Sequence, residues 1–158
     1  MNVVFKLGLA ALCSLAVVSV SRAQSASTTP EGQAQAAVKL RKALFDVQKY
    51  AYLPMEALLK GAPFNAIAAQ TSAERLEMTS SMILEIFNLD TRKFHVMTRA
   101  LDGIWTNMAD FQQKARDLHQ AAMNLDMAAK SGDADATKQA AIRVGKACGA
   151  CHDEFRSQ

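Results

Sequence analysis

The residues best suited to chemistry lie close to the C-terminus, where Cys148-Gly149-Ala150-Cys151-His152 forms a C-x-x-C-H motif. On a helix, two thiols three positions apart can add as thioethers to the two vinyl groups of one porphyrin. The histidine that follows can then bind the iron from the proximal side. The motif therefore predicts one covalently attached haem c, held by Cys148 and Cys151, with His152 as the axial iron ligand.

Three other uses of the motif stay open but have less support. A thioredoxin-like redox pair follows a strand of a βαβ unit, and no window of this sequence alternates apolar and polar residues as a half-buried strand does. A zinc site needs about four ligands, and after residue 23 the chain offers only His95 and His119 beyond the motif. A disulfide inside one helical turn would close too small a loop to stabilise much.

The composition limits the kind of fold that can position this motif. The chain has 158 residues, of which 50% are apolar and 21% charged, so neither disorder nor a collagen-like fibre is expected. Seven glycines and three prolines provide few turns, which favours long helices over a many-stranded sandwich or barrel. The formal net charge is +3 without a cluster of basic residues, so no nucleic-acid surface is predicted.

The N-terminal segment, residues 1–23, is predicted to be a cleaved secretory signal peptide. Lys6 supplies a positive charge. The apolar run that follows it, from Leu7 to Val20, has 14 residues, which is well short of the roughly 20 residues that cross a bilayer. Ser21-Arg22-Ala23 then gives a cleavage site of the small-x-small type. We therefore expect an exported, periplasmic protein that begins with a flexible tail over residues 24–29 and has no membrane segment after cleavage.

Helix signals predict an all-α domain over residues 30–158. The first helix begins after Thr29, an N-cap hydroxyl followed directly by a proline, and it ends at Gly61. The second helix is expected from about Asn65 to about Phe87.

The C-terminal half of this domain is predicted to hold two further helices. Residues 88–102 have no clean period and are expected to form a long loop. The third helix covers residues 104–129, and Asp133 caps the start of the fourth. Four amphipathic helices in this order predict an antiparallel four-helix bundle.

Within each predicted helix, apolar residues recur every three or four positions and define an inward stripe. The stripes comprise Ala37, Leu40, Leu44, Val47 and Ala51 in the first helix; Leu76, Ile83 and Phe87 in the second; Ile104, Met108, Phe111, Ala115, Leu118, Ala122, Leu125 and Ala129 in the third; and Thr137, Ala141, Val144, Cys148, Cys151 and Phe155 in the fourth. Because both cysteines lie on the stripe of the last helix, the haem is expected inside the bundle.

A single C-x-x-C-H motif near the end of an exported four-helix chain resembles the class II c-type cytochromes, whose best-known members are the cytochromes c′. The resemblance covers nearly all of the chain after the signal peptide. It includes residues 144–147 before the motif, residues 153–156 after it, Lys60-Gly61-Ala62-Pro63-Phe64 after the first helix, and Ile104-Trp105 at the start of the third.

This resemblance implies roles for three further residues. Arg41 matches an arginine of the first helix that contacts a haem propionate, and Arg156 matches an arginine one turn beyond the axial histidine. Phe45 occupies the family's distal position, four residues after Arg41 and therefore on the same helix face. The alternatives are a solvated surface position for Arg41 and an ordinary core position for Phe45.

The distal residue separates two functions within the family. Some members are low-spin electron carriers with a methionine as sixth iron ligand, whereas others leave that site open, are high-spin and bind NO or CO. A phenyl ring cannot coordinate iron, so Phe45 favours a five-coordinate, gas-binding protein over a low-spin carrier. The sequence supplies no acid–base pair beside Phe45, so we do not expect an enzyme.

Other potential iron ligands are expected to be structural. Met55 is ten residues from Phe45, roughly 15 Å along a helix, which is too far for the same haem. His95 and His119 are predicted to be surface or structural residues. The remaining methionines are predicted to fill the core; they are Met78, Met82, Met97, Met108, Met123 and Met127.

The expected partners are periplasmic redox proteins and a second copy of the chain. Members of the resembled family commonly dimerise through their first two helices. In this chain Leu53, Leu58, Ile67 and Leu76 are the candidate contacts.

Overall fold

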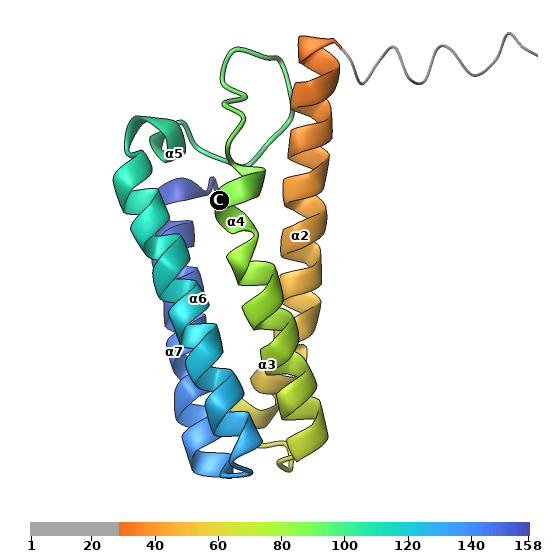
Figure 1. The fold of residues 1–158 in the computed structure, drawn as a ribbon, viewed down its shortest axis with the longest axis vertical. Coiled ribbons are helices and arrows are strands. Elements are labelled where there is room, and N and C mark those ends of the chain that lie inside the picture. The colour runs from red at the N-terminus through yellow and green to blue at the C-terminus, as the bar shows by residue number, and fades with distance from the viewer. Residues whose placement is uncertain (1–28) are drawn as a thin grey trace, which may run out of the picture.

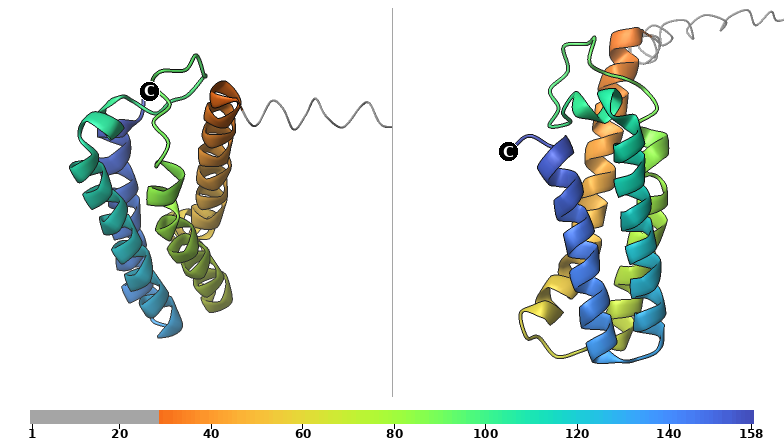
Figure 2. Two further views of the ribbon diagram at one scale, coloured as in Figure 1. Left: turned by 45° about the horizontal axis from the view of Figure 1, so that its top comes forward. Right: turned by 90° about the vertical axis from the view of Figure 1, so that its left-hand side faces the viewer.

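The computed structural model describes residues 29–158, which form an all-helical bundle (Figure 1). Its four long helices are α2 (Pro30–Leu59), α3 (Ala66–Ser81), α6 (Met108–Lys130) and α7 (Ala134–Phe155). Two single-turn helices, α4 (Ile83–Ile86) and α5 (Gly103–Thr106), lie at the end of the bundle that also holds the C-terminus. Successive long helices run in opposite directions, which confirms the predicted antiparallel four-helix bundle (Figure 2).

Side-chain caps begin three of the long helices where the sequence predicts their starts. Thr29, Asn65 and Asp133 each accept a hydrogen bond from a backbone amide two or three positions further along. Gly61 and Gly132 follow α2 and α6 with φ angles of 96° and 74°, a backbone conformation that glycine adopts without steric cost. The turns from α2 to α3 and from α6 to α7 are therefore fixed by local sequence.

Two predicted helices are interrupted. The second is divided at Met82 into α3 and the short α4, and the third is divided at Asn107 into α5 and α6. At Asn107 the backbone leaves the helical region, with φ −127° and ψ 52°. Asparagine competes with helical hydrogen bonding through its own side chain, which makes it a common point of helix interruption. Residues 88–102 contain no helix, as predicted.

The inward face of α2 differs from its predicted stripe. Leu44 and Ala51 are buried as expected, but Leu40 and Val47 are 51% and 48% exposed. Two polar side chains, Arg41 and Gln48, are buried instead. The full set of buried α2 residues is Ala34, Arg41, Leu44, Gln48, Ala51, Met55 and Leu58. The prediction was wrong because it counted only apolar residues, and two inward positions of this helix are polar.

The helices are not packed evenly around the bundle. α3 packs closely along α2 and α6, and α6 packs closely along α7, whereas α2 and α7 meet over a shorter contact. Figure 2 shows the α2–α3 pair diverging from the α6–α7 pair toward the end that carries α4 and α5. Side chains from both pairs fill the region between them at that end, and the C-x-x-C-H motif lies there on α7.

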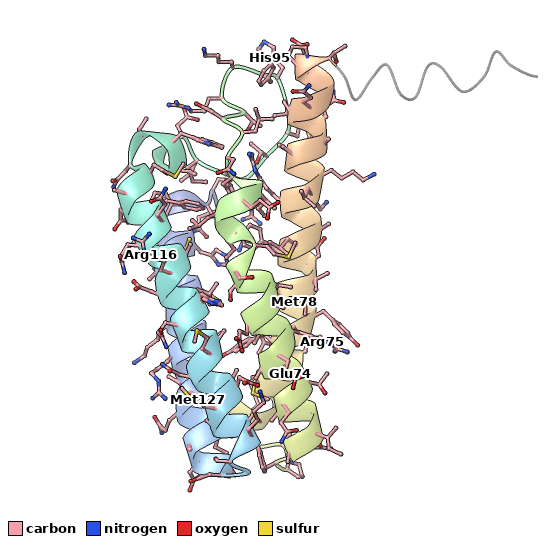
Figure 3. All side chains as sticks on the ribbon, viewed as in Figure 1. Glu74, Arg75, Met78, His95, Arg116 and Met127 are labelled. Atoms are coloured by element: carbon pink, nitrogen blue, oxygen red, sulfur yellow. The ribbon has the colours of Figure 1, made fainter. Side chains whose placement is uncertain are left out.

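The burial of several apolar side chains differs from the prediction. It differs for most of the methionines and for one candidate dimer contact on each of α2 and α3. The prediction that six methionines fill the core was wrong for five of them, because these are exposed; they are Met78, Met82, Met97, Met123 and Met127. Met78 and Met127 project from the outside of the bundle in Figure 3. Leu58 and Leu76 are buried, so neither can contact a second chain. Leu53 and Ile67, the other two candidate contacts, are exposed.

The predicted signal peptide over residues 1–23, and all but the last residue of the predicted tail, lie outside the described residues. Over residues 29–158, no helix combines the length and the apolar character that a membrane crossing requires.

Candidate haem site

The last turns of α7 bring Cys148 and Cys151 to the inward side of the helix, one turn apart. Both thiols are free and half-buried, and both side chains pack against the hydrophobic core. Burial raises the pKa of Cys151 to about 11 and also raises the pKa of Cys148. This pair is placed as two thioether bonds to a single porphyrin require.

His152 lies in the final turn of α7, directly after the second thiol, and its ring is half-buried. Burial lowers the pKa of His152, and the positive charge of Arg156 lowers it further. Nη1 of Arg156 lies 3.4 Å from Nδ1 of His152, so the structure brings these two predicted site residues together. A lowered pKa favours neutral imidazole at neutral pH, which is the form that binds a metal ion.

Arg41 is buried in α2, with only 4% of its surface exposed, which rules out a solvated position. Its Nε donates a hydrogen bond to the carbonyl of Ile86 at 2.9 Å, and Nη1 donates to Oγ1 of Thr91 at 3.0 Å. Nη2 donates to the carbonyl of Leu89. Arg41 therefore fixes the chain that leaves α4.

The environment of the Arg41 guanidinium is aromatic rather than acidic. Its Cζ lies 4.5 Å from the ring centre of Phe87 and 5.2 Å from that of Trp105, within the range of cation–π contacts. Desolvation lowers the pKa of Arg41, and the more distant charge of Asp90 offsets this in part. No carboxylate of residues 29–158 forms an ion pair with it. A buried guanidinium without a counter-charge fits a bound group that carries carboxylates, as the propionates of haem do.

A contact between Tyr52 and α7 sets the register of α2 against the C-x-x-C-H motif. The Tyr52 hydroxyl donates a hydrogen bond to the carbonyl of Ala141 at 2.8 Å. A Cβ atom at Gly145 would lie only 2.9 Å from that hydroxyl, so Tyr52 rests on the glycine. Because α2 and α7 are antiparallel, two turns back along α2 correspond to two turns forward along α7. Phe45 is therefore level with the C-x-x-C-H stretch of α7, between Cys148 and His152.

Phe45 is half-buried and belongs to a group of aromatic rings that fills this end of the bundle. Its ring centre is 6.2 Å from that of Phe87, which in turn lies 4.9 Å from Phe111. Phe111 is 5.3 Å from Phe155, so the group joins α2 to α7 through the residue after α4 and through α6. Phe45 thus stands at the α2 side of the region that the motif faces from α7.

Three residues near this site were not identified from the sequence. Gln48 and Tyr52 lie on α2 beyond Phe45, and Thr91 holds Arg41 from the loop. The spacing of Arg41, Gln48 and Met55 is seven residues each time, which is the repeat of an inward helix position. That repeat could have identified Gln48 as an inward residue, whereas nothing local marks Thr91.

The two histidines outside the motif are not at this site. His95 is exposed in the loop at the top of Figure 3, and Nδ1 of His119 lies 3.0 Å from Oγ of Ser80, which links α6 to α3. Both are placed as predicted.

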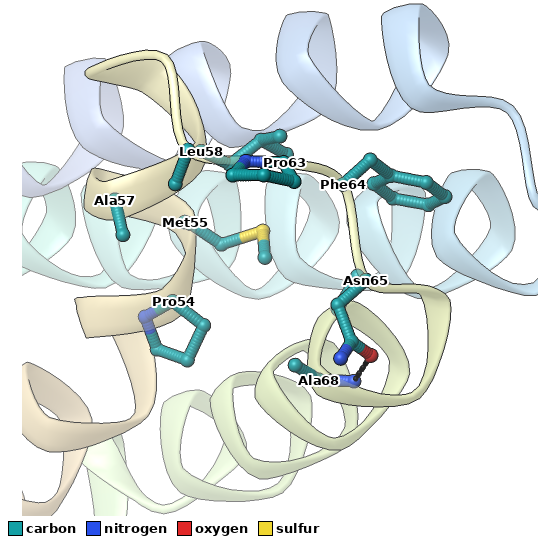
Figure 4. A pocket seen from close by; sticks show the side chains of 10 residues that line it. Pro54, Met55, Ala57, Leu58, Pro63, Phe64, Asn65 and Ala68 are labelled. Atoms are coloured by element: carbon teal, nitrogen blue, oxygen red, sulfur yellow. Dashed lines mark hydrogen bonds between the residues drawn. The ribbon is translucent and has the colours of Figure 1, made fainter.

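A separate cavity of about 170 Å³ lies where α2 turns into α3 (Figure 4). Its walls are mostly apolar, with Pro54, Met55 and Phe64 among the side chains that line it. It is at the opposite end of the bundle from the C-x-x-C-H motif, and no titratable side chain lines it.

Comparisons with known proteins agree on one family. A family model described as Cytochrome C′ matches residues 36–156. A cytochrome c′ of Rubrivivax gelatinosus is 31% identical over 123 residues, which cover 77% of this chain and 95% of that protein. The solved structure of cytochrome c prime from Shewanella frigidimarina is 34% identical, covers 79% of this chain and 97% of that one, and superposes with a TM-score of 0.74.

A second solved structure is informative about ligands. It is described as the nitric oxide complex of a mutant of cytochrome c prime from Alcaligenes xylosoxidans, and it is 29% identical to this chain. It covers 79% of this chain and 96% of its own, with a TM-score of 0.72.

Proposed function

Since this chain belongs to the cytochrome c′ family, we propose that it is an exported monohaem cytochrome whose iron site is five-coordinate, high-spin and open to NO and CO. Cys148 and Cys151 hold the haem c as thioethers, and His152 is the axial ligand. The bound haem supplies one-electron chemistry and a position for a small distal ligand. All other parts of the proposal concern what the side chains of this chain do around it.

The observation that carries the proposal is the half-buried Phe45 of α2, whose ring packs against Phe87 at the end of the bundle that holds the C-x-x-C-H motif. A phenyl ring has no lone pair to donate, so it shields the distal face without occupying a coordination position. Met55, the methionine of α2 that could be considered as an iron ligand, is buried nearly three turns further along the helix. Phe45 therefore supports an open site over a methionine-ligated, low-spin one.

Two arginines fit the haem periphery in this proposal. Arg41 supplies a buried positive charge that lacks a protein carboxylate and so pairs with a propionate. Arg156 stands beside the axial His152 on the proximal side. The solved nitric oxide complex of a related cytochrome c prime supports the choice of diatomic ligand.

The physiological setting follows from the N-terminal sequence and from the surface. A cleaved signal over residues 1–23 delivers the protein to the periplasm, where it exchanges electrons with other redox proteins. A homodimer through α2 and α3 would use Leu53 and Ile67, which are both exposed. Phe45 is itself neither an acid nor a base, so we propose electron transfer and ligand binding, rather than catalysis, as the functions of this site.

Optical and EPR spectra of the purified holoprotein, with and without CO, test this function. We expect a high-spin spectrum that changes when CO is added. A low-spin spectrum that CO does not alter would show that a protein side chain is the sixth ligand of the iron. The protein would then be an electron carrier without a gas-binding role.

A further inference from the structure

The side chain of Gln48 is an unusual occupant of the bundle interior. Only 8% of its surface is exposed, and its Nε2 is buried without a hydrogen-bond partner among residues 29–158. This Nε2 loses its hydrogen bonds to water and gains none from the described residues, which costs stability. Buried polar groups are nearly always paired, so this donor points to a partner that is not part of the chain.

The position of Gln48 identifies the space that its donor faces. On α2 it lies one turn beyond Phe45 and one turn before Tyr52, and these three positions share one side of the helix. Tyr52 rests on Gly145 of α7, and one turn back along α2 corresponds to one turn forward along the antiparallel α7, which puts Gln48 near the level of Cys148. Phe45 and Gln48 therefore occupy neighbouring turns opposite the two thiols.

The other polar groups nearby do not account for the Gln48 amide. The Tyr52 hydroxyl already donates to the backbone of α7, and the Arg41 donors are directed at Ile86, Leu89 and Thr91. The Phe45 ring between Arg41 and Gln48 carries no acceptor. A group that accepts a hydrogen bond from Nε2 has to come from what is bound between α2 and α7.

We propose that Gln48 donates a hydrogen bond from Nε2 to the diatomic ligand bound on the distal side, so that Phe45 shields the ligand while Gln48 stabilises and polarises it. This inference rests on the proposed open site and deepens it. The distal pocket has one apolar wall and one amide donor. Gln48 is accordingly a specificity residue that favours ligands able to accept a hydrogen bond.

The test compares the CO complex of the parent holoprotein with those of Gln48→Leu and Gln48→Met, which have similar volumes and no donor. We expect the C–O stretching frequency in the infrared spectrum to rise in both variants, because the hydrogen bond that polarises the ligand is lost. CO should also dissociate about fivefold faster, the factor that corresponds to one neutral hydrogen bond. Gln35→Leu, an amide removed from an exposed position of the same helix, is the matched control and should match the parent.

Thermal unfolding of the CO-free holoproteins checks that the variants are folded. A leucine or methionine at position 48 should leave the midpoint unchanged or raise it, because an unpartnered buried amide is removed. If the parent binds CO but neither variant changes its stretching frequency or dissociation rate, Gln48 does not face the ligand and this inference is wrong. If the parent does not bind CO at all, the proposed open site fails first and this inference fails with it.

Discussion

At the scale of single residues, the side of α2 that faces the motif is polar at two of its inward positions. Arg41 and Gln48 are seven residues apart and both are buried, with Phe45 between them. Nε2 of Gln48 has no hydrogen-bond partner among residues 29–158. The Arg41 guanidinium donates three hydrogen bonds but has no carboxylate partner among these residues. Such positions are costly in a simple bundle, and the proposed bound group would supply the partners that they lack.

The first prediction concerns the covalent attachment. Replacing both thiols, Cys148→Ser with Cys151→Ser, should abolish haem that survives acid–acetone extraction, because no thioether can form. Each single replacement leaves one thiol and should retain haem through one bond at lower yield. Red protein recovered from the double variant after extraction would contradict the assigned attachment site.

The second prediction concerns Phe45, which decides between an open and a closed iron site. Phe45→Ala should open the distal side and speed CO association, at a stability cost below ~3 kcal/mol because the ring is only half-buried. Phe45→Met places a thioether over the iron and should convert the spectrum toward low spin. Stopped-flow CO binding and EPR measure the two effects. Identical behaviour of both variants and the parent would mean that Phe45 is not distal.

At the scale of elements, α2 is connected to the loop over residues 88–102 through Arg41. Three hydrogen bonds from one guanidinium hold the end of α4 and the start of this loop. The far end of the loop is held by α7, because the Leu101 amide donates to the carbonyl of Phe155 at 3.0 Å. The loop therefore spans from the propionate side of the proposed site to the residues that follow the axial histidine.

The third prediction follows from that connection. Arg41→Leu leaves the acceptors at Ile86, Leu89 and Thr91 without their donor and should lower the free energy of unfolding by about 3–5 kcal/mol. It should also expose the loop to proteases near its first residues. Lys42→Leu removes a charge from an exposed neighbouring position and is the control. Urea titration and limited proteolysis provide the measurements, and equal stability of the two variants would refute the anchoring role.

The fourth prediction concerns the contact of α2 with α7. Gly145→Ala brings a methyl group to 2.9 Å from the Tyr52 hydroxyl, which must move and lose its bond to Ala141. Gly149→Ala meets no atom within 4 Å and should gain the full helix-propensity benefit of about 1 kcal/mol. In thermal unfolding, the Gly149→Ala variant should therefore be more stable than the Gly145→Ala variant by about 1 kcal/mol, the contribution of one hydrogen bond. The reverse order would show that Tyr52 does not fix this register.

The sequence was sufficient for the starts of three long helices and for the C-x-x-C-H spacing, because both depend on local signals. N-caps, glycines with positive φ and the C-x-x-C-H spacing each act within a few residues. The inward positions of α2 were not predictable in this way. Leu40 and Val47 are exposed while Arg41 and Gln48 are buried, and only tertiary packing around a bound group favours that choice.

At the scale of the whole molecule, the end of the bundle that holds the proposed haem site and the outer faces of the helices carry different kinds of side chain. The site end carries linked aromatic rings and a buried arginine. The outer faces of α2 and α3 carry exposed apolar side chains, which include Tyr50, Leu53 and Ile67. Ile67 is 78% exposed, which is unfavourable for a large apolar side chain that stays in water.

The fifth prediction uses that surface. Leu53→Lys with Ile67→Lys should convert a homodimer into a monomer, because two lysines per chain would be desolvated opposite their copies. Haem content and CO affinity should stay unchanged, since neither residue lies on the inward face of its helix. Sedimentation velocity over a range of concentrations measures the effect. A parent protein that is already monomeric, or a variant that still dimerises, would exclude this interface.

For the proposed haem attachment, the half-burial of Cys148 and Cys151 has a consequence for the order of maturation. In the folded bundle the thiols are packed against the core, and Tyr52 and residues 88–102 bind α7 on either side of them. A porphyrin cannot be inserted there without separating α2 from α7. If Cys148 and Cys151 hold the haem as proposed, the thioether bonds form while the chain is still open, and the cofactor then acts as a template around which the last contacts close.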